Sequence, residues 1–350
     1  YFFKLGKYQD WLLEFLQENP GFILPSHRQN QVIEFLSEPL NDLCISRPKE
    51  RLSWGIPLPF DQEYVTYVWF DALVNYVTAA GFGEEIFSSI WPADLHVIGK
   101  DILAPPHAVY WPIMLKACNI ELPKQILAHG WWTSSGAKMS KSTGETVSPL
   151  DLVKVYGSDI FRFFVMREMR VGQDAEFSLD RFESRYRADL GNDLGNLVSR
   201  LLHMCTNYFD SIVPPSHELD TPEQELIGKW DQTRKITLSF FEEFQFSQGL
   251  EQISGFIRAI NKYADERVPW KLAKSMEEKD VKNLQTCIST MVEALRLANS
   301  LLVAVMPEIH EKINDRLGLP ATETWDDDLD WDCRLSGGKL KEKIILFPRK

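Results

Sequence analysis

The pattern of apolar and polar positions changes along the chain from mixed to almost wholly helical. Residues 1 to about 50 show apolar positions at helical spacing. Beyond a turn region, three short runs rich in β-branched and aromatic residues predict strands. They are YVTYVWF from Tyr64, LHVIG from Leu95 and ILAHGWW from Ile126. Helical segments at 72–80 and about 107–118 separate them, and this alternation predicts a parallel sheet, half of a doubly wound nucleotide-binding fold.

The remainder of the chain predicts an α-helical bundle. A helix is expected behind Ser148, with Pro149 at its first position. From about Asp189 nearly every segment has helical spacing, and a strand is expected again only in KEKIILFP near the end of the chain. The fold class is therefore α/β: the second half of a Rossmann-like parallel sheet, followed by an all-α bundle.

Composition narrows the class of protein only slightly. The chain has 350 residues, a formal net charge of -12 and five cysteines without a CxxC pair. The length predicts two or three domains, and the dispersed cysteines argue against a zinc site and a disulfide framework. The acidic balance argues against a general affinity for DNA or membranes, although a local basic patch can still bind nucleic acid. The segment MVEALRLANSLLVAVM is too short to span a bilayer and is expected to be a core helix.

The segment GAKMSKSTG, from Gly136 to Gly144, concentrates two lysines and several hydroxyls in a loop. It follows the last predicted strand of the sheet, and ligands of such folds lie beyond the carboxyl ends of the strands. Lys138 and Lys141 could therefore surround the oxygens of a triphosphate, with Ser140 and Ser142 as hydroxyl donors. On composition alone, a soluble surface turn is the competing interpretation.

The string KMSKS resembles the second signature motif of class I aminoacyl-tRNA synthetases, and its flanks resemble the methionyl-tRNA synthetase family. The flanking motifs are YVWFDALVNY, HVIGKDIL, HGWWTSSGAKMSKS, NLVSR and ERVPWKLAK, and together they cover nearly the whole chain. The resemblance implies ATP and Mg²⁺ as reaction partners, with Lys141 and Lys138 as catalytic residues. For ATP binding it implies Lys138, Ser140, Lys141, Ser142, His129 and Gly130. For the methionine side chain and its neighbourhood it implies Trp69, Ala72, Tyr76, Asp101, Ile102, His107 and Trp111.

The helical part carries a second resemblance, to the residues that read the CAU anticodon of the methionine tRNA. Asn196 and Arg200 are four residues apart and share one helical face, where they offer an amide and a guanidinium to base edges. Trp270, behind Pro269, offers a flat ring for an unstacked base. Each feature alone is common on ordinary helices, and only their joint spacing favours RNA recognition.

One departure from the family pattern concerns His107 and Trp111. Five residues separate Asp101 from His107 where the family has four. An extra residue within a helix rotates everything after it by about 100°. Pro105 and Pro106 suggest that the extra residue is accommodated before the helix begins, so that the later register is kept.

The resemblance also implies how the chain is divided and what it lacks. Four parts are expected: a helical linking segment 1–60, a catalytic half-domain 61–147, a stem-contact connector 148–188 and an anticodon-binding domain 189–350. The HIGH-type motif and the zinc-bearing insertion of the family are not found, so the chain is interpreted as the C-terminal portion of a methionine-tRNA ligase that is inactive alone, with zinc unlikely in this portion. The alternatives are another class I synthetase and a non-catalytic tRNA-binding module. A monomer is expected, without membrane association and in the cytoplasm, with an organellar matrix as the second choice.

Overall fold

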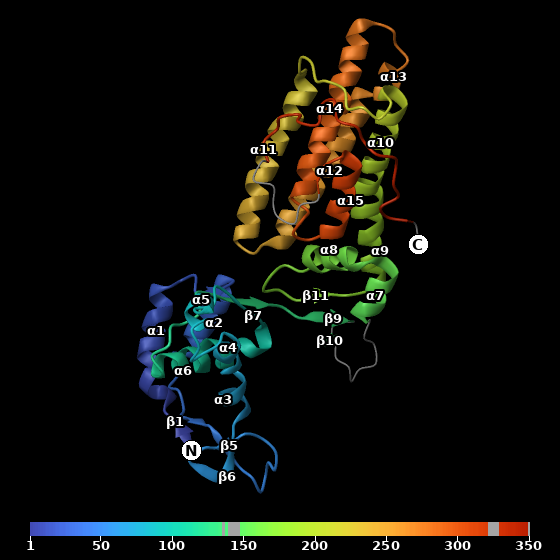
Figure 1. The fold of residues 1–350 in the computed structure, drawn as a ribbon. Coiled ribbons are helices and arrows are strands. Elements are labelled where there is room, and N and C mark those ends of the chain that lie inside the picture. Colours follow the sequence, from blue (N-terminus) through green and yellow to red (C-terminus); the bar gives the residue numbers. More distant parts are fainter. Residues whose placement is uncertain (135–136, 139–147, 321–328, 349–350) are drawn as a thin grey trace. The chain divides into compact units, whose positions relative to one another are not determined.

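The computed structural model describes residues 1–134, 137–138, 148–320 and 329–348, and the chain forms two compact units (Figure 1). The first unit comprises Tyr1–Trp131 and Val171–Asp174, and the second comprises Trp132–Arg170 and Ala175–Lys350. None of the described helices is long and apolar enough to cross a membrane.

A parallel sheet lies at the centre of the first unit. Its strands are β2 (Ile23–Leu24), β8 (Ile126–His129) and β7 (His96–Gly99), in that order. In the middle strand, Ile126 lies opposite Ile23 on one side and His96 on the other. The strand predicted at 95–99 is confirmed, and the one predicted at 126–132 is confirmed as far as His129, whereas Trp132 begins a strand of another sheet. The fold class of a parallel sheet with a helical region is confirmed as well.

The run YVTYVWF does not join the parallel sheet, so this part of the prediction was wrong. Its first residues belong to β6 (Asp61–Thr66), which pairs antiparallel with β4 (Ser46–Pro48) and β5 (Pro57–Leu58). Only Val65 of β6 is buried, whereas the first three residues of β8 are all buried. One exposed face is typical of an antiparallel strand, and burial on both faces is typical of a parallel one. The third parallel strand, β2, has two residues, too few to show a period within a segment predicted as helical.

Two apolar clusters surround the sheet and share one helix. Buried side chains of α1 (Gln9–Glu18) and α2 (Ser26–Phe35) pack with the three strands and with Ile113 of α6 (Trp111–Ala117). On its other face α6 supplies Trp111 to a second cluster, with residues of α4 (Asn75–Ala79). The unit is completed by β1 (Phe2–Phe3), η1 (Leu5–Tyr8), β3 (Leu43–Cys44), α3 (Val68–Ala72), α5 (Phe87–Ile90), η2 (Lys100–Ile102) and η3 (Leu103–Tyr110).

The second unit is built around a helical bundle (Figure 1). Its long helices are α10 (Asn196–Phe209), α11 (Thr221–Glu242), α12 (Phe246–Arg267), α14 (Glu278–Ser300) and α15 (Pro307–Leu317). Helix α14 is central: it packs against the other four, and every residue from Thr286 to Ser300 is buried. The segment predicted to be a core helix is therefore confirmed as one up to Ser300.

Shorter elements complete the second unit. A small sheet has the order β10 (Ala137–Lys138), β9 (Trp132–Ser134), β11 (Ala175–Glu176). The helix expected behind Ser148 is present as α7 (Pro149–Tyr156). The others are α8 (Ser158–Glu168), α9 (Leu179–Arg185), the π-helical η5 (Tyr186–Gly195) and α13 (Pro269–Leu272).

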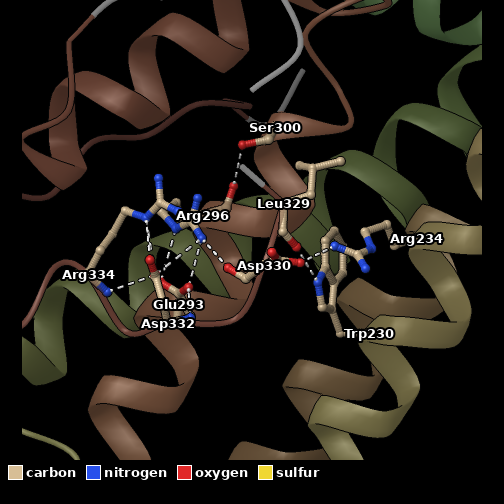
Figure 2. Close-up of polar contacts among 9 residues, drawn as sticks. All are labelled: Trp230, Arg234, Glu293, Arg296, Ser300, Leu329, Asp330, Asp332 and Arg334. Atoms are coloured by element: carbon tan, nitrogen blue, oxygen red, sulfur yellow. Dashed lines mark hydrogen bonds and ion pairs between the residues drawn. The ribbon is translucent and has the colours of Figure 1, made fainter. Parts of the chain in front are cut away.

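Residues 329–348, here called the strap, run over the bundle without forming the strand predicted for KEKIILFP. Their backbone bonds instead to loops, to the end of α15 and to side chains, with an isolated antiparallel bridge between Ile212 and Lys339. The start of the strap is held by the buried pair Glu293 and Arg296 of α14 (Figure 2). Arg296 donates to the carbonyl of Asp330 at 3.0 Å, and Glu293 accepts from the N–H of Asp332 at 3.1 Å. Trp230 donates its indole N–H to the carbonyl of Leu329 at 3.0 Å.

Candidate functional site

An aromatic cluster assembles in the first unit from segments that are far apart in the sequence. Helix α3 supplies Trp69, α4 supplies Tyr76, η3 supplies His107 and α6 supplies Trp111. The His107 ring lies 5.9 Å from Trp69 and 5.7 Å from Tyr76, edge to face in both cases, and Tyr76 lies 5.9 Å from Trp111. Four of the residues predicted to bind methionine are thus joined by a series of ring contacts. Of the other three, Ala72 is exposed at the end of α3, Ile102 is half-buried beside His107, and Asp101 is exposed after the end of β7.

Hydrogen bonds fix the protonation of His107. Its Nδ1 lies 2.7 Å from the carbonyl oxygen of Ile102, which can only accept, so Nδ1 carries the proton. Its Nε2 lies 2.8 Å from the hydroxyl of Tyr76, and in the neutral ring this nitrogen accepts. Burial lowers the pKa of His107, which is 2% exposed, so the ring is neutral at pH 7.

His96 is a second buried histidine of the cluster, and it was not among the predicted site residues. It accepts a hydrogen bond from the indole N–H of Trp111 at 3.2 Å, and its ring lies 4.3 Å from that of Tyr76. Burial, and then the proximity of His107, lower the pKa of His96 to about 4. The cluster is therefore an uncharged, aromatic environment in which each imidazole has a defined donor and acceptor side.

The extra residue between Asp101 and His107 falls at the start of η3. Ala104 has an extended backbone (φ -112°, ψ 130°), and the helix continues from there without a break into α6. Because Ala104 is not helical, the helical register begins after it, and an insertion at this point does not rotate the residues that follow. His107 and Trp111 consequently both face the aromatic cluster.

The carboxyl ends of β7 and β8 bring Asp101 and His129 close to one glycine. A methyl group added to Gly99 would lie 2.7 Å from Oδ1 of Asp101 and 3.8 Å from the His129 ring. Both side chains are exposed there, at the edge where ligands of parallel sheets bind. Gly130 is buried behind them, and a methyl group at Gly130 would collide with the carbonyl of Gln173.

A charged group at the same edge was missed by the sequence reasoning. Lys100 donates to Asp174 at 2.7 Å and lies 4.3 Å above the ring of Trp131, whose backbone N–H also donates to Asp174 at 2.9 Å. The bonds from Lys100 and Trp131 lower the pKa of Asp174. Asp174 is 74 residues from Lys100, in a segment without a recognisable motif, so the sequence contained no signal for this pairing.

The lysine loop lies mostly outside the described residues, including Ser140, Lys141 and Ser142. Lys138 belongs to β10 and pairs with Thr133 of β9. On the other side of β9, Thr133 is the register partner of Glu176 in β11. The last described residue before the loop, Lys138, thus belongs to an edge strand of a three-stranded sheet.

In the bundle, Arg200 and Trp270 meet as a pair. The Arg200 guanidinium lies 5.5 Å from the centre of the Trp270 ring and donates to Asp265 at 2.9 Å. Trp270 is 37% exposed, and Pro269 is buried beneath it at the start of α13. Asn196 is exposed at the first position of α10, one turn before Arg200. Asp265 had not been predicted, because a single carboxylate on a long helix carries no pattern.

Comparison with known proteins identifies the family of the chain. Residues 1–202 match the family model described as tRNA synthetases class I (M). The chain is 42% identical over its whole length to methionine-tRNA ligases of Clostridium tetani and Fusobacterium nucleatum, of which it covers 54% and 55%. It thus spans about half the length of the curated relatives it matches.

Solved structures agree with the sequence relatives. Mycobacterium tuberculosis methionyl-tRNA synthetase in complex with methionyl-adenylate matches all of this chain, with a TM-score of 0.93 and 40% identity, and the match covers 68% of that protein. The free form of the same synthetase matches with a TM-score of 0.90 and 38% identity. The expected resemblance is confirmed, and the alternative of a synthetase of another amino-acid type loses its support. On this evidence the chain belongs to the methionine branch of the class I tRNA synthetases.

Proposed function

We propose that the protein to which this chain belongs is a methionine-tRNA ligase. The methionine carboxylate attacks the α-phosphate of ATP, which is bound with Mg²⁺, to give methionyl-adenylate and pyrophosphate. A terminal hydroxyl of the tRNA then attacks the methionyl carbonyl, and AMP leaves. The observation that carries the proposal is the neutral aromatic cluster, in which His107 bonds to the carbonyl of Ile102 beyond the end of β7, in a chain with the family relationship above.

The aromatic cluster suits the side chain of methionine. A thioether gains from contact with aromatic ring edges, by about 0.3 to 1.5 kcal/mol. Trp69, Tyr76, His107 and Trp111 offer such edges, and Ala72 and Ile102 add small and aliphatic surface at the margin. A charged imidazolium would hold water in the slot, so the neutral state of His107 favours an apolar guest.

The strand ends and the lysine loop suit ATP and the reacting groups. Asp101 would orient the substrate at the end of β7, and His129 and Gly130 would contact ATP at the end of β8. Lys138, Ser140, Lys141 and Ser142 would surround the phosphates, with Lys141 nearest to the charge that develops on the departing pyrophosphate.

The bundle suits an anticodon loop with the sequence CAU. Trp270 would stack on an unpaired base, and Asn196 and Arg200 would bond to base edges. The contact between Arg200 and Trp270 supports this assignment, because it holds the guanidinium plane and the indole together on one exposed surface. Pro269 would fix the start of α13 beneath the ring, and the protein would act as a monomer.

Aminoacylation of a CAU-anticodon tRNA by the whole protein tests the proposal. Lys141→Ala should slow methionine-dependent ATP–pyrophosphate exchange about 100-fold or more. Lys154→Ala is the matched control, because Lys154 is exposed on α7 and pairs only at the surface, with Asp151. Unchanged exchange in Lys141→Ala would remove the catalytic assignment.

The two halves of the proposal are tested separately. Trp270→Ala should weaken the tRNA-dependent step by about 5- to 150-fold, since base stacking contributes about 1 to 3 kcal/mol, while exchange without tRNA stays as in the parent. Trp54→Ala, at a tryptophan that is 75% exposed in the first unit, is its control. The 350-residue chain alone should show no exchange. RNA binding without any exchange by the whole protein would favour the non-catalytic module instead.

A further inference from the structure

A cavity of about 630 Å³ lies between η5, the start of α10 and the end of the strap. Ligand pockets in proteins are typically about 300 to 1,000 Å³. One wall comes from a tandem repeat in the sequence, DLGNDLGN, which spans 189–196. The four-residue period places Asn192 and Asn196 on the same wall, with Gly191 and Gly195 beside them.

The wall formed by η5 and the start of α10 carries side-chain amides without an intramolecular hydrogen bond among the described residues. Asn192 and Asn196 are both exposed, and no hydrogen bond joins either amide to another residue in the described part of the chain. Ser199 adds a hydroxyl one turn further along. A primary amide offers a donor and an acceptor side by side, the combination that matches the edge of a nucleobase.

The strap forms the opposite, apolar wall and is firmly held. The Tyr186 hydroxyl donates to the carbonyl of Pro348 at 2.7 Å, and the Phe347 ring packs edge to face on Tyr186 at 6.2 Å. Gly195 permits this approach, because a methyl group there would lie 3.0 Å from Phe347. Ile345 remains 72% exposed at the cavity, which leaves an aliphatic surface for the flat face of a base.

The strap is fixed along the bundle before it reaches the cavity. Leu340 donates its backbone N–H to Ser211 at 2.7 Å, and Lys341 donates to Arg316 at 2.9 Å. Glu293 and Arg296 hold its start (Figure 2), so hydrogen bonds attach the strap to the bundle at its start, at Leu340 and Lys341, and at Pro348. A preformed wall lowers the ordering cost of a bound ligand.

We infer that this cavity is a further base-binding site for single-stranded RNA, adjoining the surface of Arg200 and Trp270, in which the amides of Asn192 and Asn196 read a base edge and Ile345 covers its face. Asn196 belongs to the cavity and also lies one helical turn before Arg200, so the site is continuous with the proposed anticodon surface. Arg187 also lines the cavity; its side chain is 62% exposed and pairs at the surface with Glu183 at 3.5 Å, and a bound phosphate would share this cation with the carboxylate. The inference rests on the proposed function and deepens it, because it adds the strap to the RNA-binding surface.

Binding of RNA hairpins to the 350-residue chain tests the site. The probe is a 17-nucleotide hairpin with CAU in a seven-nucleotide loop, together with a series in which each loop nucleotide in turn is abasic. Asn192→Ala and Ile345→Ser should each raise the Kd of the intact hairpin about 5- to 30-fold. Asn207→Ala is the matched control, because Asn207 is exposed on α10 outside the cavity. One abasic position should abolish the difference between these two variants and the parent.

The outcomes separate the inference from the proposed function. If Trp270→Ala weakens binding while Asn192→Ala and Ile345→Ser bind like the parent, the inference is wrong and the anticodon assignment stands. If the two variants keep their penalty on every abasic hairpin, no base occupies the cavity and the inference is again wrong. If the parent chain does not prefer CAU over a scrambled loop, both fail. Unfolding midpoints equal to that of the parent show that the variants are folded.

Discussion

Replacement of Arg296 by methionine tests whether the buried ion pair of α14 holds the bundle and the strap together. The side chains of Glu293 and Arg296 are 1% and 2% exposed. Arg296 donates to Glu293 at 2.7 and 3.0 Å and to the carbonyl of Asp330 at 3.0 Å. Arg296→Met removes these donors and leaves the Glu293 carboxylate buried without its cation. The expected loss is about 3 to 5 kcal/mol of unfolding free energy.

A double replacement separates the charge from the volume. Glu293→Met combined with Arg296→Met leaves no buried charge, so the double variant should be more stable than Arg296→Met alone. The matched control is Lys282→Met on the same helix. Lys282 pairs with Glu278 at 2.7 Å, but both side chains are more than half exposed, so the expected loss is below about 1 kcal/mol.

Urea unfolding of the chain, followed by helical circular dichroism, measures these differences. A loss of less than about 1 kcal/mol in Arg296→Met would refute the reasoning, because the buried carboxylate would then have found another partner or water. A double variant less stable than the single one would refute it as well, since the pair would then be stabilising in itself.

Two further predictions concern the cluster and the helices. The pKa of His96 in the folded protein, about 4, lies below the ordinary value of 6.5. Between these two values the unfolded chain binds a proton that the folded chain does not. The contribution of neutral His96 to the unfolding free energy is therefore complete above about pH 6.5 and is lost as the pH falls towards 4. His96→Gln keeps an acceptor for Trp111 but does not titrate. Between pH 7.5 and 5, the unfolding free energy of the parent, measured in urea, should therefore fall by about 2 kcal/mol relative to that of the variant. A difference between the two proteins that does not change with pH would contradict the lowered pKa of His96. At Gly228 in α11 an added methyl group meets no atom within 4 Å, so Gly228→Ala should raise the free energy of unfolding by up to about 1 kcal/mol, measured by heat or urea. Gly249→Ala in α12 should lower it, because the added methyl group would overlap the ring of Phe241. Equal effects at the two glycines would show that helix propensity alone determines the change in stability.

The sequence predicted those helices that are long enough for their pattern of apolar positions to repeat several times. The bundle helices and the central α14 were recognisable, because 22- and 23-residue elements repeat their apolar face several times. The two-residue strand β2 was not, since its place in the sheet depends on pairing with β8. KEKIILFP has the composition of a strand, but its Phe347 packs on Tyr186 instead, so tertiary packing overrode local propensity.

The residues of the candidate site were likewise predictable where they belong to a recognisable sequence pattern, and not where their role depends on burial and contacts. Trp69 and Tyr76 could be grouped because they belong to one quoted motif, and His107 and Trp111 because they follow HVIGKDIL at the family spacing but for one extra residue. His96 was overlooked, although it begins the quoted motif HVIGKDIL, because its importance comes from the burial that lowers its pKa and from its bond to Trp111. The roles assigned to all these residues stay predictions until the variants above are measured.

The path of the chain through the first unit has a consequence for its synthesis. The chain leaves this unit after Trp131 and returns only for Val171–Asp174, where Asp174 binds Lys100 and the N–H of Trp131. Lys100 and Asp174 are 74 residues apart, so at about 5 to 20 residues per second a ribosome needs about 4 to 15 s to make the partner after the lysine. The ion pair of Lys100 and Asp174 can therefore form only after the residues of the lysine loop have been made, and the first unit includes residues that follow that loop in the sequence.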